Sequence, residues 1–287
     1  MLNLTEDEIT FDWKYKKDIK VSISCIIFNQ INYFSKALDS FLMQKTSFAF
    51  EILVHDDAST DGSQDLIRKY QKKYPNIIYP VYQSENQFSK KKKPHYLNFA
   101  RARGDYIAMC DGDDYWIDEN KLSIQYNIMK ENSDYNISFH AVKINNMLNN
   151  KNKIKLLSKK IKIFSFNEII LKDHKIYTST VTMMIKKDTV INLPKYCIEA
   201  PTEDWYLMIL GSHPKGALYI PKVMAVYNLF VPNSWTLQDK SSRHYFKNIF
   251  SLLKVLKYYK ISIFSVIGLK IINYFVKGLI LKFVLLK

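Results

Sequence analysis

Three closely spaced carboxylates follow an apolar segment near the middle of this 287-residue chain. The segment Tyr106–Cys110 is short and mostly apolar, which is typical of a strand buried on both faces of a sheet. It leads directly into Asp111, Asp113 and Asp114. Ligands of open α/β sheets bind where strands end, and acids this close repel one another unless a cation is present. The spacing predicts a site for Mg²⁺ or Mn²⁺ with a diphosphate, whose oxygens these ions prefer. The alternative is an ordinary acidic turn.

A second acidic cluster follows the apolar segment Glu51–His55. Here Asp56 and Asp57 begin a polar stretch that ends at Ser63. Carboxylates form strong charged hydrogen bonds with N–H and O–H donors, so they suit a nucleotide base and a ribose. We expect Asp57 to contact such a ligand directly and Asp56 to stabilise the loop as an Asx turn.

Alternating strand and helix patterns surround both clusters and would position them. Apolar β-branched runs predict strands at 21–28, 51–55 and 77–82, and helical spacing predicts helices at 33–44, 63–74 and 96–103. This alternation predicts a parallel, doubly wound sheet, with both clusters on the same edge. Farther along, the sequence predicts helices at 121–131, 166–171 and 199–210, strands at 135–144 and 180–185, a loop or hairpin at 145–162, and a strand pair at 217–231.

Four segments, in this order, resemble the family 2 glycosyltransferases of GT-A fold. Residues 21–44 are similar to that family's first strand and helix, and residues 56–63 are similar to its nucleotide-binding signature. The segment Asp111-Gly112-Asp113 resembles its DxD element, and Glu203-Asp204 resembles its acceptor-side acidic motif. The resemblance implies an α/β, Rossmann-like, mostly parallel sheet flanked by helices, and a role in making a bacterial surface polysaccharide.

The sequence departs from the family pattern in four places. Ala58 replaces the usual glycine, and the usual glycine near Asn86 is missing. The run Lys90–Lys93 occupies a loop that is small in the family; we expect a solvated loop, with contact to the diphosphate as the alternative. The segment Tyr227–Trp235 stands where the family often has an Arg- or His-containing segment.

The resemblance also implies roles for individual residues. Asp113 is expected to hold the metal ion, which stabilises the leaving diphosphate, and Asp111 to face the ribose or a metal-bound water. Asp204 is expected to be the general base for the acceptor hydroxyl, with Glu203 as second choice. Direct displacement by that hydroxyl would invert the anomeric centre. The other expected contacts are Phe28, Asn29, Asp56, Asp57, Asp111 and Gly112 on the donor side, and Trp116, His140 and Trp205 on the acceptor side. For Gly112 the reason is a close approach of the backbone to the sugar, and for Trp116 plain core packing is the alternative.

The net charge of +15 is concentrated toward the C-terminal end of the chain. Between Phe246 and Lys287 there are eight lysines and no carboxylate. The longest uncharged run there, Ile261–Leu269, has nine residues, well short of the ~20 that span a bilayer. This pattern predicts basic amphipathic helices on an anionic membrane surface. A nucleic-acid partner is not expected, because the sheet region has no basic-aromatic motif. The alternative is a helical pair packed on the catalytic domain or on a second subunit.

The sequence predicts a cytoplasmic protein, peripheral on the inner face of the plasma membrane. Residues 1–18 lack the basic start and apolar run of a signal peptide. The three cysteines, Cys25, Cys110 and Cys197, form no CxxC pair, which fits a reducing compartment. We expect an N-terminal extension at 1–18, a GT-A domain at 19–238 with a nucleotide-binding half at 19–116 and an acceptor half at 117–238, and a membrane-associating helical tail at 239–287.

These features predict an inverting hexosyl- or N-acetylhexosaminyl-transferase. It would move a sugar from a nucleotide-sugar donor, expected to be a UDP-sugar, to a hydroxyl of a lipid-linked or cell-surface glycan. Two alternatives stay open: a transferase that acts on a polyol-phosphate or non-sugar acceptor, and a non-catalytic membrane-bound assembly partner that keeps the fold. An oligomer is compatible with either.

Overall fold

The computed structural model describes residues 2–171, 179–232, 234, 237 and 242–261. Its first half confirms the predicted alternation of strand and helix. α3 ends just before Pro75, because a residue that precedes proline avoids the helical conformation. In chain order this half contains α1 (Glu6–Ile9), β1 (Ile19–Ile27), α2 (Ile31–Leu42), β2 (Ala49–Asp56), α3 (Ser63–Lys73), β3 (Ile78–Tyr82), α4 (Pro94–Arg101) and β4 (Tyr106–Met109).

The second half mixes very short elements with the longest strand and the longest helix that the structure describes. The predicted helices at 121–131 and 166–171 are observed at those bounds. The full order is β5 (Tyr115–Trp116), α5 (Lys121–Glu131), β6 (Ile137–Asn146), β7 (Lys151–Lys155), β8 (Lys162–Phe164), α6 (Phe166–Leu171), the 3₁₀ turn η1 (Thr180–Thr182), β9 (Met184–Lys186), α7 (Lys187–Val190), α8 (Lys195–Ile198), α9 (Asp204–Ser212), β10 (Ala217–Leu229) and α10 (Ser242–Tyr258).

Within the described residues the strands form one ten-stranded sheet. The order is β3-β2-β1-β4-β9-β6-β10-β5, with β7 added beside β6 and β8 beside β10. The strands β3, β2, β1 and β4 are parallel, as predicted. Beyond β4 the sheet is mixed, because β9 is antiparallel to both β4 and β6, and β5, β7 and β8 also pair antiparallel. The doubly wound parallel arrangement therefore holds only for the first half.

The predicted strand pair at 217–231 is wrong. The segment is the single strand β10, which runs parallel to β6 on both sides of a register shift between Ile220 and Ala225. Pro221 lies at this shift. Proline has no N–H to donate to the ladder, so it interrupts the pairing locally, and the strand resumes on the same partner.

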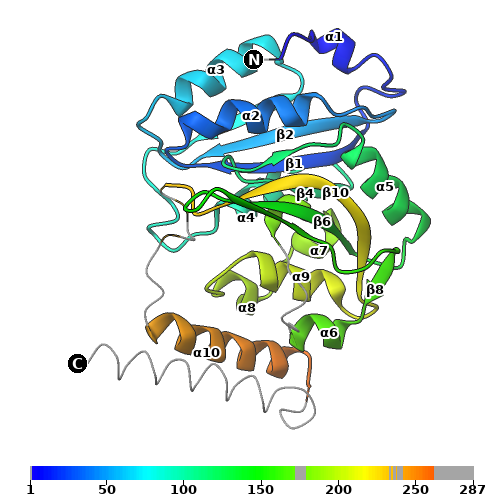
Figure 1. Cartoon of the computed structure of the whole chain (residues 1–287), viewed down its shortest axis with the longest axis vertical. Helices are drawn as coiled ribbons and strands as arrows, with labels where there is room; N and C mark the ends of the chain where they lie inside the picture. Colours follow the sequence, from blue (N-terminus) through cyan, green and yellow to red (C-terminus); the bar gives the residue numbers. More distant parts are fainter. Residues whose placement is uncertain (1, 172–178, 233, 235–236, 238–241, 262–287) are drawn as a thin grey trace.

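The sheet separates two apolar cores. Side chains of α2, α3 and α5 pack on one face, and those of α4, α6, α8 and α9 pack on the other. Strand alternation supplies both cores, since Ala108 belongs to the first core and Ile107 and Met109 belong to the second. Figure 1 shows α2 and α3 on one side of the sheet and α8 and α9 on the other, with α10 beyond them.

Both ends of the described chain pack on this body. At the N-terminal end, the indole N–H of Trp13 donates to Thr46 (3.0 Å). In α10, Leu252, Val255 and Leu256 are buried in the second core. This matches the alternative in which part of the tail packs on the catalytic domain, so α10 does not present these residues to a membrane. The rest of the predicted tail, 262–287, lies outside the described residues. No helix in the described ranges is long and apolar enough to cross a bilayer.

Candidate active site

The two acidic clusters meet at one edge of the sheet, as predicted. β2 and β4 both run parallel to β1 and flank it, so their carboxyl ends open on the same side. The end of β1 ties the clusters together. The N–H of Asp57 donates to the carbonyl of Ile27 (2.9 Å), and the N–H of Gly112 donates to the carbonyl of Ile26 (2.8 Å).

The carboxylates of Asp113 and Asp114 lie where ionisation is unfavourable. Burial and repulsion from Asp111 raise the pKa of Asp113 to about 7. Burial and repulsion from Asp113 raise the pKa of Asp114 well above its usual range. One oxygen of Asp114, Oδ1, accepts the N–H of Asn228 (2.8 Å), whereas Oδ2 is buried without a hydrogen-bond partner among the described residues. This part of the edge therefore favours a positive ligand.

The carboxylate of Asp111 is held from two sides. Its Oδ1 lies 2.9 Å from Nε2 of His95, and its Oδ2 accepts the hydroxyl of Thr180 (3.0 Å). The other ring nitrogen of His95, Nδ1, lies 2.8 Å from Oγ of Ser24 on β1. Burial alone would lower the pKa of His95, but the adjacent Asp111 outweighs it, so the pKa is raised. His95 therefore holds Asp111 in a fixed orientation from one side, and Thr180 holds it from the other.

Sequence reasoning missed His95, because histidine spacing showed no metal-binding pattern. The usable signal was its position near the N-terminus of α4, a helix that begins at the same sheet edge as the acidic clusters. Thr180 and Ser24 were missed as well, since nothing in the sequence pairs them with residues so far away.

The reason for Gly112 differs from the predicted one. A Cβ atom at this position would come within 3.1 Å of Oε1 of Gln30 and within 3.2 Å of the carbonyl oxygen of Ile26. The close approach is therefore to the end of β1 and the following turn, rather than to a sugar.

Asp57 stabilises a loop, a role that was expected only of Asp56. Its Oδ1 accepts the N–H of Gln87 (2.6 Å), and its Oδ2 accepts the N–H of Phe88 (3.0 Å). Both oxygens are thus used to hold the loop between β3 and α4. The loop-stabilising role predicted for Asp56 is also observed, since it accepts the N–H of Ser59, and ligand contact by Asp57 stays a prediction.

Asp56 keeps one oxygen available. Its Oδ2 accepts the N–H of Ser59 (3.1 Å) and the amide of Gln64 (2.7 Å), whereas its Oδ1 is buried without a partner among the described residues. Tyr82 is the residue paired with Asp56 across β2 and β3, and its hydroxyl is also buried without a partner there. The guanidinium of Arg68 lies 4.9 Å from the centre of the Tyr82 ring. The two unpartnered groups, Oδ1 of Asp56 and the hydroxyl of Tyr82, are thus both buried at the end of neighbouring strands.

Asn29 joins the loops that follow β1 and β2. Its backbone is left-handed (φ 52°), its N–H donates to Oγ of Ser59 (2.9 Å), and its side-chain oxygen accepts the N–H of Thr60 (2.8 Å). The preceding Phe28 is half-buried at the same edge. The structure thus brings Phe28 and Asn29, two of the predicted donor-side residues, to the acidic edge. Asn29 also connects the two loops there.

The acid pair at the start of α9 faces the Asp111 cluster. Burial raises the pKa of Glu203; the charges of His95 and Lys93 lower it, and Asp111 raises it further. These charges place Glu203 beside the same edge, although it lies about ninety residues farther along the chain. The adjacent carboxylate, Asp204, accepts the N–H of Trp205 through Oδ1 (2.7 Å).

The three predicted acceptor-side residues are buried, and their acceptor role stays a prediction. Trp205 lies in the second core, where its indole N–H donates to the carbonyl of Ile169 (3.2 Å). The ring of Trp116 packs on Phe41 with centroids 4.8 Å apart, which is the core-packing alternative. His140 is buried within β6, and burial lowers its pKa well below the usual range. Trp116 and Trp205, which follow the two groups of acids in the sequence, are thus part of the cores that support those acids.

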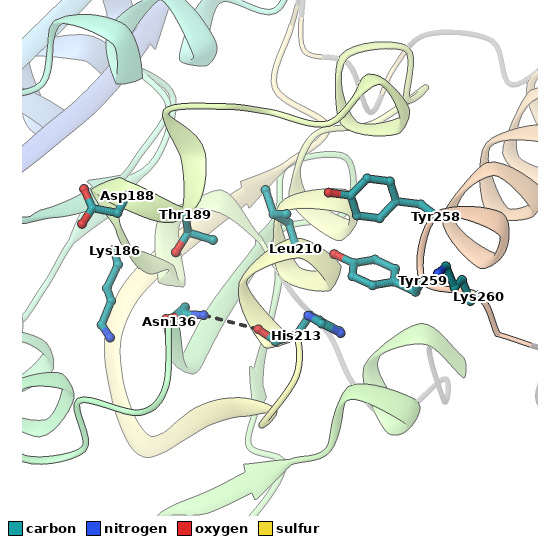
Figure 2. A pocket seen from close by; sticks show the side chains of 9 residues that line it. All are labelled: Asn136, Lys186, Asp188, Thr189, Leu210, His213, Tyr258, Tyr259 and Lys260. Carbon is teal, nitrogen blue, oxygen red and sulfur yellow. Dashed lines mark hydrogen bonds between the residues drawn. The ribbon is translucent and has the colours of Figure 1, made fainter.

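A cavity of ≈760 Å³ lies away from these carboxylates (Figure 2). Lys186 lines it, and that residue pairs with Tyr106 at the beginning of β4, the opposite end from Asp111. Figure 2 shows His213 and Tyr259 on its other side, from the end of α9 and from the residues after α10. This cavity is therefore separate from the candidate active site.

Asp113 and its neighbours fit a divalent cation that is shared with a bound diphosphate. Among the described residues no three His, Cys, Asp or Glu side chains form a complete ligand group. A shared ion needs fewer protein ligands, because phosphate and water oxygens complete its shell. The raised pKa of Asp113 and the buried, unpartnered Oδ2 of Asp114 both indicate a place where positive charge is favourable.

The fold and the site together define a nucleotide-binding α/β protein of the Rossmann-like kind, with carboxylates at the carboxyl edge of its parallel strands. Comparison with known sequences is more specific. Residues 22–192, more than half of the chain, match the family described as Glycosyl transferase family 2. The chain belongs to this family.

Individual relatives agree with the assignment. The poly(ribitol-phosphate) beta-glucosyltransferase of Bacillus spizizenii is 35% identical over 115 residues, which are 40% of this chain and 18% of that protein. Staphylococcus aureus TarS, solved with UDP-GlcNAc, has a similar fold, with a TM-score of 0.65 at 16% identity over 83% of this chain and 67% of that one. The mannosyltransferase PcManGT of Pyrobaculum calidifontis, solved with GDP-Man and Mn²⁺, gives a TM-score of 0.54 at 16% identity over 88% and 70%. The chain spans less than half the length of the curated relatives that it matches.

Proposed function

We propose that this protein is a metal-dependent, inverting glycosyltransferase. It moves a sugar from a nucleotide-sugar donor to a hydroxyl of a cell-surface or lipid-linked glycan. The observation that carries the proposal is that the charge of Asp111 acts both on Asp113, whose pKa is raised to about 7, and on Glu203 of the acid pair Glu203/Asp204. Membership of glycosyl transferase family 2 and similarity to TarS support it.

The donor is proposed to be a UDP-sugar that lies along the edge from β2 to β4. The unused oxygen of Asp56 would accept an N–H of the base, beside the hydroxyl of Tyr82. Asp111, oriented by His95, would face the ribose, and Asp113 would hold Mn²⁺ or Mg²⁺. When bound, the ion supplies positive charge to the diphosphate that leaves. Solved complexes of TarS with UDP-GlcNAc and of PcManGT with GDP-Man and Mn²⁺ support this arrangement.

Asp204 is proposed to accept the proton of the attacking hydroxyl, with Glu203 as its neighbour. A hydroxyl that the pair activates is proposed to attack from the side opposite the diphosphate. Attack from that side inverts the anomeric centre. Burial raises the pKa of Glu203, and the charges of His95 and Lys93 oppose that shift.

A screen of nucleotide sugars, by thermal shift with Mn²⁺ and then by release of the nucleoside diphosphate, tests the proposal. A donor should raise the melting temperature, because ligand binding stabilises the folded state. Asp113→Asn should abolish metal-dependent turnover, and Asp204→Asn should abolish transfer while leaving donor binding intact. Glu203→Gln should retain part of the rate. The reverse order of the last two variants would assign the base to Glu203, and normal turnover in Asp113→Asn would refute the metal role.

A polyol-phosphate acceptor is the second candidate. It is favoured by the 35% identity to the poly(ribitol-phosphate) beta-glucosyltransferase. A non-catalytic assembly partner is the remaining alternative, and metal-dependent hydrolysis of a nucleotide sugar would exclude it.

We also propose that the protein works at the inner face of the plasma membrane, held there by residues 262–287 of the basic tail. Support comes from their lysine-rich apolar sequence and from the position of α10, which packs on the catalytic body and leads into them. Flotation with anionic liposomes should be lost when residues 262–287 are removed; unchanged flotation would refute the anchor.

A further inference from the structure

A cavity of ≈500 Å³ lies between the loop that precedes α4 and the segment 191–198. One side is formed by the lysines of the run 91–93. The rest of the lining is mostly aliphatic, with Leu97 from α4 and Ile191, Leu193 and Ile198 from the segment 191–198, next to the polar Asn192. A concave site with lysines on one side and hydrocarbon on the other is an unusual pairing on a protein surface, and the function proposed above does not use it.

The three lysines that line the cavity form no close ion pair with a carboxylate of the described residues. Lys90, the first of the run, pairs with Glu85 and does not line the cavity. In the described part of the chain no ion pair within 4.0 Å joins Lys91, Lys92 or Lys93 to a carboxylate. Three like charges held side by side favour an anion with several oxygens, since lysine binds phosphate as a point charge.

The aliphatic side is open to solvent. Leu97, Ile191 and Ile198 are 42%, 53% and 51% exposed. Covering them would be favourable for a hydrocarbon ligand, at about 25 cal/mol per Å² of apolar surface. A sugar or polyol chain gains little here, because its hydroxyls would lose water against groups that cannot form hydrogen bonds. The two sides together fit a phosphate that is attached directly to a hydrocarbon chain.

The cavity adjoins the proposed base. Lys93 and Tyr96 line it, and both also feel the charges of Glu203 and Asp204. A ligand phosphate on the lysines would therefore lie close to the point where the acceptor hydroxyl is activated.

We propose that this cavity binds the diphosphate and the first isoprenoid units of a lipid-linked acceptor. The inference rests on the proposed function and specifies its acceptor. Because Lys93, which lines the cavity, interacts with the charges of Glu203 and Asp204, the sugar that accepts would be near the lipid end of the acceptor. The enzyme would thus extend a short lipid-linked glycan rather than the far end of a long polymer.

Calorimetric titration of the full chain with farnesyl diphosphate tests the site. Farnesol and inorganic diphosphate serve as half-ligands. Farnesyl diphosphate should bind at least tenfold more tightly than either, because only it engages both sides. The double variant Lys91→Ala/Lys92→Ala should weaken its binding about tenfold, equivalent to about 1.4 kcal/mol. The double variant Ile191→Ser/Ile198→Ser should weaken it by a similar factor.

Matched controls separate the cavity from general charge and hydrophobicity. Lys90→Ala removes a lysine of the same run that is paired outside the cavity. Ile154→Ser removes an exposed isoleucine on β7, 60% exposed. Neither should change the affinity for farnesyl diphosphate. UDP affinity, measured on every variant, reports whether the protein is folded.

Equal binding by wild type and by Lys91→Ala/Lys92→Ala would overturn the proposal. So would tighter binding of a polyol-phosphate oligomer than of farnesyl diphosphate, which would indicate the polyanionic acceptor instead. Loss of binding to anionic phosphatidylglycerol vesicles in these variants, with no effect on farnesyl diphosphate, would mark the patch as a membrane contact and also overturn it. If farnesyl diphosphate binds as expected but no nucleotide sugar is turned over, the proposed function fails and the binding site stands.

Discussion

Replacing His95 should lower the free energy of unfolding, and the size of the loss should depend on pH. The imidazole is 2% exposed and lies between Oγ of Ser24 (2.8 Å) and Oδ1 of Asp111 (2.9 Å). In His95→Leu the Asp111 carboxylate keeps only the hydroxyl of Thr180. A hydrogen bond to a charged group contributes about 1.5–3 kcal/mol, and a neutral one about 0.5–1.5 kcal/mol. The hydroxyl of Ser24 loses one hydrogen-bond partner in this variant but keeps another, because the amide of Asn98 still donates to it (3.1 Å).

The sign of the pH effect follows from the raised pKa of His95. A histidine whose folded pKa lies above its ordinary value near 6.5 stabilises the fold fully below that value. This stabilisation is lost as pH rises through the folded pKa. Wild type should therefore exceed His95→Leu by about 2 kcal/mol near pH 6 and by about 1 kcal/mol near pH 9. Urea unfolding of both proteins across this range measures the difference.

The variant His95→Gln is the control. Its amide N–H can donate to Asp111 but carries no charge, so its deficit relative to wild type at high pH should be smaller than that of His95→Leu. If the deficit of His95→Leu is constant with pH, or grows as pH rises, the charged His95–Asp111 pair is refuted. UDP affinity with Mn²⁺ should fall about tenfold in His95→Leu and recover partly in His95→Gln, because Asp111 is oriented again.

Three further predictions concern the acidic edge and its supports. Without metal, the free energy of unfolding should fall as pH rises from about 4 to about 7, because the raised pKa of Asp113 means that the folded state resists ionisation of this carboxyl. The variant Asp113→Asn should lack the contribution of Asp113 to this fall and should melt at a higher temperature than wild type at pH 8. A lower melting temperature of the variant would contradict the prediction. Asp57→Asn should cost about 1–3 kcal/mol and speed amide hydrogen exchange at residues 83–93, and unchanged exchange there would refute the loop clamp. Arg103→Ala should cost about 1–2 kcal/mol in urea unfolding, because it breaks a 2.6 Å ion pair with buried Glu51; the pair lies at the opposite sheet edge, so a changed UDP affinity would show that the two edges are coupled.

The first half of the fold was predictable because local patterns and topology agree there. Each strand is an apolar run, each helix has an amphipathic stripe, and parallel connection brings the ends of β2 and β4 to one edge. The second half was less predictable because its strands are short and join by hairpins and crossovers that leave little periodic signal. Pro221 is the clearest case. Its sequence suggests a turn, whereas pairing with β6 on both sides keeps β10 continuous.

The roles within the site depend on partners that are distant in sequence. Asp56 and Asp57 are adjacent and chemically alike, and local patterns cannot tell which one the loop 83–93 will occupy. The structure distinguishes them, because Gln87 and Phe88 take both oxygens of Asp57 and leave one oxygen of Asp56 unused. The burial of Trp205 was not predicted for a related reason, since the helix face that bears it turns toward Ile169 in the core.

The lysines of the run Lys90–Lys93 look equivalent in the sequence but have different surroundings in the structure. As sequence, Lys90–Lys93 is four equivalent charges, and a solvated loop is the simplest expectation. In the structure Lys90 finds Glu85, whereas Lys93 is half-buried beside Glu203 and Asp204, where burial lowers its pKa and those two acids oppose the shift. A lysine that is partly desolvated next to the proposed base is costly unless an anion is meant to lie there. The acids around Asp113 favour a cation, whereas the acid pair Glu203/Asp204 already has the cation Lys93 nearby. A donor diphosphate would balance the positive charge of the cation at Asp113, and an acceptor diphosphate would balance that of the lysines.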